Sequence, residues 1–447
     1  MKDVTSGFTL RGARLVDPYT GIDRVDDLHV GGGRILAVGA APAGFEPGQL
    51  IEGSGLILAP GLVDLAARLR EPGFEYKATL ESEMQAAVAG GITSLVCPPD
   101  TDPILDEPGL IEMLKHRVRG LALTNLYPLG ALTVRLEGVD LTEMAELSEA
   151  GCVGFSQAAL PIVDTQALLR AMQYANTYGF TVWLQPQDPY IGRGGVAHSG
   201  AVATRLGLPG EPVLTETVAL HTIFVLVRAT GCRVHLCRLS SGAGIELVRR
   251  AKAEGLPVTA DVAVHHLHLI DVDIGYFDAS CRVDPPFRSQ RDREAIRAGL
   301  LDGTIDAICS DHTPVAEDAK VLPFGEAEPG TTGLELLLPL ALKWAQEEGV
   351  DLLRMLALLT RTPARIVGIE GANGLQPDAV ADLCLFDPDL PWVVDDATLL
   401  SQGKDTPYQG RELLGRAMMT VVGGRIAFRR ETGETRRGAD HRDAARP

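Results

Sequence analysis

The chain has 447 residues, 45% of them hydrophobic and 22% charged, and a formal net charge of −18. That length accommodates a barrel of about 250 residues plus a smaller module. The acidic balance predicts no nucleic-acid partner and no anionic membrane partner, because both require a cationic surface. No apolar run approaches the roughly 18 residues of a transmembrane helix, and residues 1–12 hold no apolar signal core. Seven scattered cysteines without a CxxC pair favour reduced thiols and a cytoplasmic location.

Between about Leu58 and Ile369 the sequence alternates between short apolar strands and segments with helical periodicity. The strands are predicted over residues 61–69, 91–99, 123–132, 151–157, 180–187, 232–240, 257–267 and 305–312. Helical patterns between them cover 110–120, 141–151, 166–179, 215–231, 244–255 and 293–303. Eight such alternations predict the α/β class and a TIM (β/α)8 barrel over residues 58–373. The alternative, an open doubly wound sheet, would place a Gly-rich phosphate loop after the first strand, where this chain has none.

Strand-forming segments flank the predicted barrel on both sides. Residues 1–57 and 374–430 together predict a small composite β-sandwich domain assembled from both ends of the chain. Residues 431–447 are charged without an apolar period and predict a disordered tail. Two Gly- and Pro-rich runs, 188–210 and 316–333, are interpreted as long loops on the face of the barrel where active sites form.

Five segments together resemble one known family. They are PGLVDLAARLREPG, GFEYKATLESEMQAAVAGGITSLVCPPDTDP, VTADVAVHHL, VDPPFRSQRDREAIRAGLLDGTIDAICSDHTP and TPYQGRELLGRAMMTVVGGRIAF. They closely resemble the dihydroorotase family of the amidohydrolase superfamily, and the resemblance covers nearly the whole chain. It implies the barrel, the split β-sandwich and, in active members, a zinc pair at the C-terminal ends of the barrel strands. Activity does not follow from family membership, because chemistry depends on the site.

The resemblance assigns six metal-ligand positions, and five of them have lost the family's ligand. Active members read VDLHVHLREPG in the first strand, where this chain has Ala66 and Arg68 in place of the two histidines. The remaining positions hold Gln157, Gln185, Arg238 and the one retained ligand, Asp311. A methyl group and a protonated guanidinium offer zinc no lone pair, and a neutral amide is a weak ligand. We therefore predict no zinc pair, no other cofactor and no metal-bound hydroxide for hydrolysis.

The positions at which relatives bind substrate are also altered. Arg70 is retained where relatives clamp the carboxylate of dihydroorotate, and His198 is retained in the loop GGVAHSG. Asp100 and Asp284 replace two asparagines of the family. Each would oppose an anionic ligand by about 4 kcal/mol for a like pair about 4 Å apart. These four residues are interpreted as vestiges of a substrate pocket, with Asp311 as a relict of the catalytic centre.

A retained Asp311 at the barrel centre requires a cation nearby, because an unpaired buried carboxylate is costly. Our hypothesis is that Arg68, Arg238 or both fill the former metal space and pair with Asp311, with Asp100 or Asp284 as further partners. In the alternative, the arginines point to solvent at the barrel mouth.

Other groups near the predicted site have simpler interpretations. In VHHLH an extended strand would place His266 and His268 on one face and His265 on the other, but active relatives carry HH there without binding metal. No relocated metal site is therefore predicted. Cys237 is interpreted as core rather than as a nucleophile, and His312 as a residue that caps or orients loops.

The resemblance implies a function as well as a fold. The family contains catalytically silent chains that associate with the catalytic chain of aspartate carbamoyltransferase in pyrimidine biosynthesis, and this chain is expected to be one of them and to form a homo-oligomer. The alternative is an active dihydroorotase or related cyclic-amide hydrolase with an atypical or single-metal site around Asp311. A third possibility is an independent scaffold with an unrelated partner.

Overall fold

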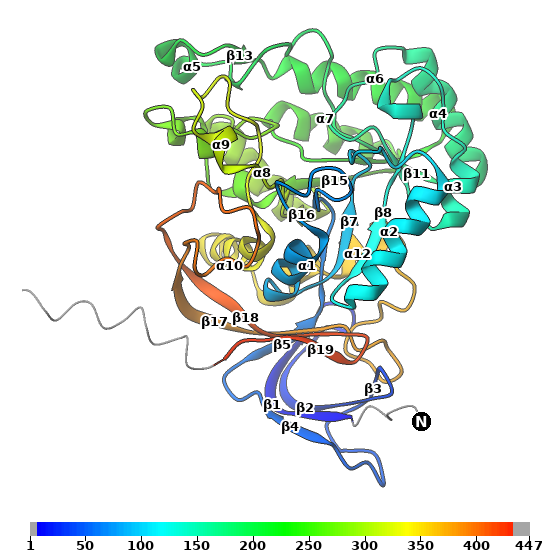
Figure 1. The fold of residues 1–447 in the computed structure, drawn as a ribbon, viewed down its shortest axis with the longest axis vertical. Coiled ribbons are helices and arrows are strands. Elements are labelled where there is room, and N and C mark those ends of the chain that lie inside the picture. Colours follow the sequence, from blue (N-terminus) through cyan, green and yellow to red (C-terminus); the bar gives the residue numbers. More distant parts are fainter. Residues whose placement is uncertain (1–6, 432–447) are drawn as a thin grey trace, which may run out of the picture.

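The computed structural model describes residues 7–431, which form a barrel surrounded by helices and, beside it, a β domain (Figure 1). The barrel strands are β6 (Leu62–Asp64), β7 (Ile92–Cys97), β8 (Asn125–Pro128) with β9 (Gly130–Ala131), β10 (Phe155–Ser156), β11 (Thr181–Leu184), β14 (Arg233–Leu236), β15 (Val258–Ala263) and β16 (Ala307–Cys309). Neighbours pair in parallel, and β8 and β9 are two parts of one strand. A parallel bridge from Ala67 to His312 closes the ring. The predicted TIM barrel is confirmed.

Helices follow the barrel strands and cover the outside of the barrel (Figure 1). They are α1 (Leu80–Ala89), α2 (Pro108–Leu121), α3 (Met144–Ala150), α4 (Thr165–Tyr178), α6 (Leu214–Thr230), α7 (Gly242–Ala253), α8 (Gln290–Asp302), α10 (Leu337–Glu348), α11 (Leu352–Ala357) and α12 (Arg361–Val367). Local sequence explains their ends. In α8 the Ser289 side chain accepts a hydrogen bond from the Asp292 backbone N–H, and Gly303 ends the helix at φ 81°.

The two predicted loop regions contain short elements. The first holds β12 (Ala197–His198), α5 (Ala201–Leu206) and β13 (Gly210–Glu211), and the second holds α9 (Glu317–Lys320). Both regions follow barrel strands, β11 and β16, at their C-terminal ends. In the part of the chain from 7 to 431, no helix combines the length and apolarity needed to cross a membrane.

The β domain joins the two ends of the chain. Its strands are β1 (Phe8–Asp17), β2 (Ile22–Gly31), β3 (Arg34–Val38), β4 (Gln49–Glu52), β5 (Ile57–Pro60), β17 (Leu383–Val393), β18 (Glu412–Val422) and β19 (Arg425–Arg429). All eight belong to one sheet, in which β5 pairs with β1 on one side and with β17 on the other. The strands expected to form a sandwich are thus one continuous sheet with its own hydrophobic core. The predicted tail, apart from Glu431, lies outside the described residues.

A small apolar cluster lies among the barrel strands. Val63, Val96, Trp183, Ala263 and Cys309 come from five different strands and are all at most 4% exposed. Side chains from alternate strands fill a TIM barrel in this way, so the interior is packed rather than open. A catalytic or binding site is therefore expected at the C-terminal ends of the strands, where the residues that directly follow each strand surround the barrel mouth.

Candidate functional site

The first barrel strand presents Ala66 and Arg68 at the mouth because its end is tightly held. The Asp64 carboxylate accepts hydrogen bonds from the Ser310 backbone N–H at 2.8 Å and from the Ser310 hydroxyl at 2.5 Å. Burial raises the pKa of Asp64 to about 6. The Arg68 backbone N–H donates to the His312 carbonyl at 2.8 Å. These contacts bind the first strand to the last one and bring position 68 beside position 311.

Both arginines at former ligand positions pair with Asp311. The Arg238 Nη1 lies 2.9 Å from the Asp311 Oδ1, and the Arg68 Nη1 lies 3.7 Å from the same oxygen. The Arg68 Nε forms a second ion pair with Asp100 at 2.7 Å, and its Nη1 donates to the Thr313 hydroxyl at 3.0 Å. The three partners Arg68, Arg238 and Asp311 are all at most 9% exposed. The predicted ion-pair cluster is confirmed, and the solvent-facing alternative is wrong.

The electrostatics of the cluster favour the charged forms. Burial opposes the charge on Arg238, but the Asp311 carboxylate outweighs it and raises the pKa of Arg238 above its usual value. Burial likewise opposes the charge on Asp100, and Arg68 outweighs it, so the pKa of Asp100 is lowered. The Nε2 of His265 lies 3.9 Å from Asp311, and burial lowers the pKa of His265 to about 3. At neutral pH this imidazole is uncharged, and the arginines are the cations that compensate Asp311.

The two glutamines at former ligand positions have their amides engaged elsewhere. The Gln157 Oε1 accepts from the Thr133 hydroxyl at 2.9 Å, and its Nε2 donates to the Leu136 carbonyl at 2.7 Å. The Gln185 Oε1 accepts from the Arg238 Nη2, and its Nε2 lies 3.4 Å from Asp284. Each amide oxygen therefore already accepts a hydrogen bond from a neighbouring side chain. Asp284 therefore contacts the cluster through Gln185, while Asp100 contacts it through Arg68.

The donor set at these six positions does not fit a zinc pair. It offers one carboxylate, two engaged amides, two guanidiniums and the methyl group of Ala66, which packs beside the barrel's apolar cluster. Zinc is bound in proteins by thiolate, imidazole and carboxylate, and a guanidinium 2.9 Å from the single carboxylate competes for the oxygen that an ion would need. No reaction step through such a metal pair can be derived from these residues.

A pocket of about 190 Å³ remains beside the ion-pair cluster, lined by Arg68, Arg70, Asp100, Asp284, Asp311 and Glu328 among others. The Arg70 Nε donates to the Pro314 carbonyl at 2.8 Å, and its Nη2 lies 3.8 Å from Glu328. Burial, and secondarily Arg68, lower the pKa of Arg70. Three of the four predicted substrate residues thus share one pocket. The fourth, His198, lies on β12 and is not among the described residues that line it.

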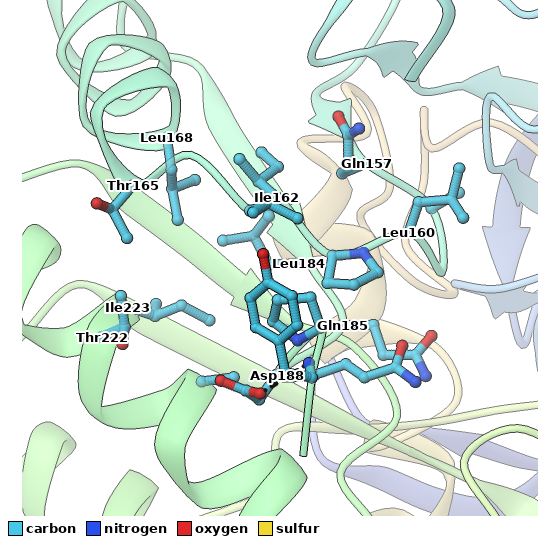
Figure 2. A pocket seen from close by; sticks show the side chains of 17 residues that line it. Gln157, Leu160, Ile162, Thr165, Leu168, Leu184, Gln185, Asp188, Thr222 and Ile223 are labelled. Atoms are coloured by element: carbon cyan, nitrogen blue, oxygen red, sulfur yellow. Dashed lines mark hydrogen bonds between the residues drawn. The ribbon is translucent and has the colours of Figure 1, made fainter. Parts of the chain in front are cut away.

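A second pocket, of about 160 Å³, is lined in part by Gln157 and Gln185 (Figure 2). Its wall combines α4, α6 and the segments that follow β10 and β11, with Leu168, Leu184 and Ile223 supplying apolar surface. This pocket was not predicted. The residues that line it are mostly apolar and have no distinctive sequence pattern, so the pocket can be recognised only from how the helices and loops pack.

The prediction for VHHLH is wrong in its local structure. The strand β15 ends at Ala263, and the chain continues as a 3-10 turn, η2 (Val264–Leu267), rather than as an extended strand. The rings of His265 and His266 are 4.8 Å apart, and burial lowers the pKa of each to about 3. The Nε2 of His268 instead lies 2.9 Å from the Leu340 carbonyl oxygen. Residues alternate between faces only in extended chain, so the turn removes the predicted arrangement.

The structure brings together a polar triad that sequence reasoning missed. One ligand atom each of His235, Cys237 and Asp261 lie within 4.8 Å of one another. His235 Nε2 is 2.9 Å from Asp261, and its Nδ1 is 2.8 Å from the Thr259 hydroxyl. Asp261 also accepts from the Arg238 backbone N–H at 2.6 Å, which helps to position that arginine. The available signal was the spacing of His235 and Cys237, because two residues one apart in an extended chain lie on the same face.

His312 joins three parts of the molecule. Its Nδ1 accepts from the Gly333 N–H at 3.1 Å, so its Nε2–H donates to Glu83 of α1 at 2.7 Å. Glu83 also accepts from the Ser401 hydroxyl at 2.6 Å and from the Gln402 N–H at 2.9 Å. The residue after Asp311 therefore connects the last barrel strand to α1 and to the segment that precedes β18.

The cysteines of the native protein are expected to be unreactive. All seven are free, six are buried, and burial raises the pKa of every one, that of Cys97 to about 12. A thiol reacts as its thiolate, so Ellman's reagent at pH 8 should titrate fewer than about one thiol per chain before denaturation. After denaturation in guanidinium it should titrate all seven. Rapid modification of Cys237 in the folded protein would contradict its assignment to the core.

The barrel, the β domain built from both chain ends and the cluster at the strand ends define an amidohydrolase architecture. Two protein-family models match the chain, one described as Amidohydrolase family over residues 201–428 and one described as Dihydro-orotase-like over residues 55–243. The chain belongs to the dihydroorotase-like family of amidohydrolases.

Its relatives include proteins with two different names. It is 44% identical to the "Dihydroorotase-like protein" of Pseudomonas putida over 94% of this chain and 98% of that one, and equally identical, over the same shares, to its counterpart in Pseudomonas aeruginosa. It is 38% identical to the "Dihydroorotase" of Geobacter sp. strain M21, with the same coverage. The L-hydantoinase (dihydropyrimidinase) of Arthrobacter aurescens superposes with a TM-score of 0.83 at 24% identity, over 94% of this chain and 95% of that one. At that identity the likeness concerns the fold alone.

Proposed function

We propose that this chain is a catalytically inactive dihydroorotase-like protein that acts as an assembly subunit for the catalytic chain of aspartate carbamoyltransferase in pyrimidine biosynthesis. The observation that carries the proposal is the contact of Arg238 and Arg68 with Asp311, the one retained position of the family's metal site. Cyclic-amide hydrolysis in this family requires a metal-activated hydroxide, and two buried guanidiniums stand at positions that the resemblance assigns to its metal ligands. An ion-pair cluster at these positions stabilises the fold but supplies no nucleophile for hydrolysis.

The partner follows from the family rather than from the pocket. Silent family members associate with the transcarbamoylase. The present barrel retains a complete fold, and the polar side chains at its mouth are paired with one another, as expected of a chain that uses its outer surface to bind a partner. The same reasoning predicts a cytoplasmic homo-oligomer without zinc or any other cofactor. The vestigial residues Arg70, Asp100, Asp284 and His198 carry no catalytic role in this proposal.

The proposal is tested on the purified full chain and on a co-expressed pair. We expect less than about 0.1 equivalent of zinc by elemental analysis and no ring opening of dihydroorotate above a no-enzyme blank, with an active dihydroorotase from a relative as the positive control. Co-expression with the transcarbamoylase catalytic chain of the same organism should yield a stable complex in size-exclusion chromatography. Two equivalents of zinc, or turnover lost on chelation, would reject inactivity. Failure to form the complex would reject the partner and leave a scaffold with another partner.

The triad of His235, Cys237 and Asp261 favours a second candidate, a hydrolase with a single atypical metal. Imidazole, thiolate and carboxylate are zinc ligands, and Thr259 would hold the other nitrogen of His235. Cobalt titration discriminates the two functions, because a thiolate-bound cobalt absorbs in the near ultraviolet. We expect no such band; a band that the Cys237→Ser substitution abolishes, together with turnover, would favour this candidate.

A further inference from the structure

The pocket of Figure 2 extends outward from the ring of barrel strands. Trp183 of β11 belongs to the apolar cluster inside the barrel, so the next residue, Leu184, points outward to the helices. Leu184 lines the pocket together with Leu168 of α4 and Ile223 of α6. None of the described residues that line this pocket also lines the pocket beside the ion-pair cluster. The two hollows are therefore separate sites.

The pocket has the size of one small ring. Its volume is about 160 Å³. A protein cavity of about 150 Å³ lined by leucine, isoleucine and phenylalanine binds benzene. Figure 2 shows Leu168 and Ile223 on one side of the pocket and Gln157 and Gln185 on the other. This division of the wall suits an occupant with an apolar ring and one polar edge.

The charge of the wall restricts the class of occupant. Of the described residues that line the pocket, Asp188 alone carries a charge. Its Oδ1 accepts hydrogen bonds from the backbone N–H groups of Tyr190 at 2.9 Å and of Ile191 at 2.8 Å, so this carboxylate shapes the loop after β11. A wall with a carboxylate and no cation opposes an anion. The mostly apolar surface also makes the transfer of an ammonium group from water costly, so an uncharged occupant is favoured.

One polar group of the wall lacks a partner. The amides of Gln157 and Gln185 are already hydrogen-bonded. The Thr222 hydroxyl donates to the Val218 carbonyl at 3.2 Å. The amide oxygen of Gln187, in contrast, is buried and accepts no hydrogen bond from the described chain. Such an atom is costly unless a donor reaches it, and the soft terminal torsion of glutamine lets the amide turn toward a hydroxyl or N–H group in the pocket.

Three apolar side chains of the wall are also exposed to solvent. Leu160, Val163 and Tyr190 are 52%, 57% and 66% exposed. They belong to the segments that follow β10 and β11. Exposed apolar groups that rim a concave site are typical of a ligand-binding pocket. These segments provide an entrance that does not pass through the pocket beside the ion-pair cluster.

We propose that this pocket binds an uncharged molecule with one six-membered ring and one hydroxyl or amide group. The ring packs among Leu168, Leu184 and Ile223, and the polar group forms a hydrogen bond with the Gln187 amide. The inference concerns a pocket separate from the ion-pair cluster, so it does not depend on the proposed function.

Phenol, which is uncharged at pH 7, is the probe, and toluene, benzoate and benzylamine vary its polar group and its charge. Ligand-observed NMR titration of the full chain should give a phenol dissociation constant of about 1 mM or lower. Toluene has the ring without a donor and should bind about fivefold more weakly. Benzoate and benzylamine should show no saturable binding up to about 10 mM, because each would bring a charge into a mostly apolar site.

Substitutions locate the site. Ala219→Leu adds volume to the pocket wall on α6 and should raise the phenol dissociation constant at least about tenfold. Ala229→Leu is the matched control, since Ala229 is exposed on the same helix and does not line the pocket. Gln187→Leu removes the polar partner and keeps an apolar wall, so it should weaken phenol about fivefold without weakening toluene. Circular dichroism should show that all three variants keep the wild-type fold.

The absence of saturable phenol binding to the wild-type chain would overturn the proposal. An unchanged phenol affinity in folded Ala219→Leu would overturn the location, and an equal loss of phenol and toluene in Gln187→Leu would overturn the assigned hydrogen bond. Tighter binding of benzoate or benzylamine than of phenol would overturn the uncharged class. None of these measurements depends on zinc, turnover or the transcarbamoylase, so failure here is distinguishable from failure of the proposed function.

Discussion

Replacing Arg238 by alanine is expected to lower the free energy of unfolding by about 3–5 kcal/mol, the typical cost of removing one partner of a buried ion pair. The substitution leaves Asp311, 4% exposed, with Arg68 at 3.7 Å and with His265, which is neutral at pH 7. It also removes the hydrogen bond that Gln185 accepts. Urea denaturation at pH 7 measures the loss. A change below about 0.5 kcal/mol would contradict the structural role of the cluster.

Two further variants separate the ion pair from the volume of the side chain. Arg238→Met with Asp311→Leu removes both charges and should recover most of the stability, because apolar groups of similar size replace a buried pair at little cost. Arg68→Ala should cost less, about 1–2 kcal/mol, since its partner Asp100 keeps 27% of its side chain exposed and water can compensate it. No loss at Arg68 would indicate that Arg238 alone compensates Asp311.

The second large effect is expected at Glu83. Glu83→Ala leaves His312, the Ser401 hydroxyl and the Gln402 N–H without their acceptor, all in a site where Glu83 and His312 are fully buried. We expect a loss of about 3–5 kcal/mol in the free energy of unfolding at pH 7, as for other truncated buried networks. Glu81→Ala, an exposed glutamate of the same helix, is the control and should stay within about 0.5 kcal/mol of the wild type.

The effect of Glu83 should depend on pH in a defined direction. Burial opposes its charge, but the hydrogen bonds from His312, the Ser401 hydroxyl and the Gln402 N–H outweigh burial and lower the pKa of Glu83 below its usual value. A carboxyl group with a lowered folded-state pKa contributes stability that is present above its unfolded pKa of about 4.3 and is lost as the pH falls through the folded value. The difference between wild type and Glu83→Ala should therefore shrink below about pH 4. A difference that grows on acidification would contradict the assignment of Glu83 as a hydrogen-bonded carboxylate.

The fold could be predicted because its pattern is local. All eight barrel strands lie within the predicted segments, as the alternation of apolar strands and amphipathic helices is encoded in neighbouring residues. The turn over Val264–Leu267 was not predicted, since His265 and His266 fit the alternation of a strand. The assembly of the β domain from both chain ends was predicted, but its pairing as a single sheet, with β5 next to β17, was not, because strand order is not encoded in neighbouring residues.

The sequence by itself determined what this barrel mouth is made of: a methyl group, two amides, two guanidiniums and one carboxylate at the six positions that the resemblance to the family predicts for metal ligands. Residue type alone decides whether an atom has a lone pair for zinc. Only the tertiary structure decided that Arg238 pairs with Asp311 and that the Gln157 amide accepts a hydrogen bond from Thr133. Those outcomes depend on the register of strands far apart in the chain and on which side chains compete for each buried acceptor, and neither is encoded locally.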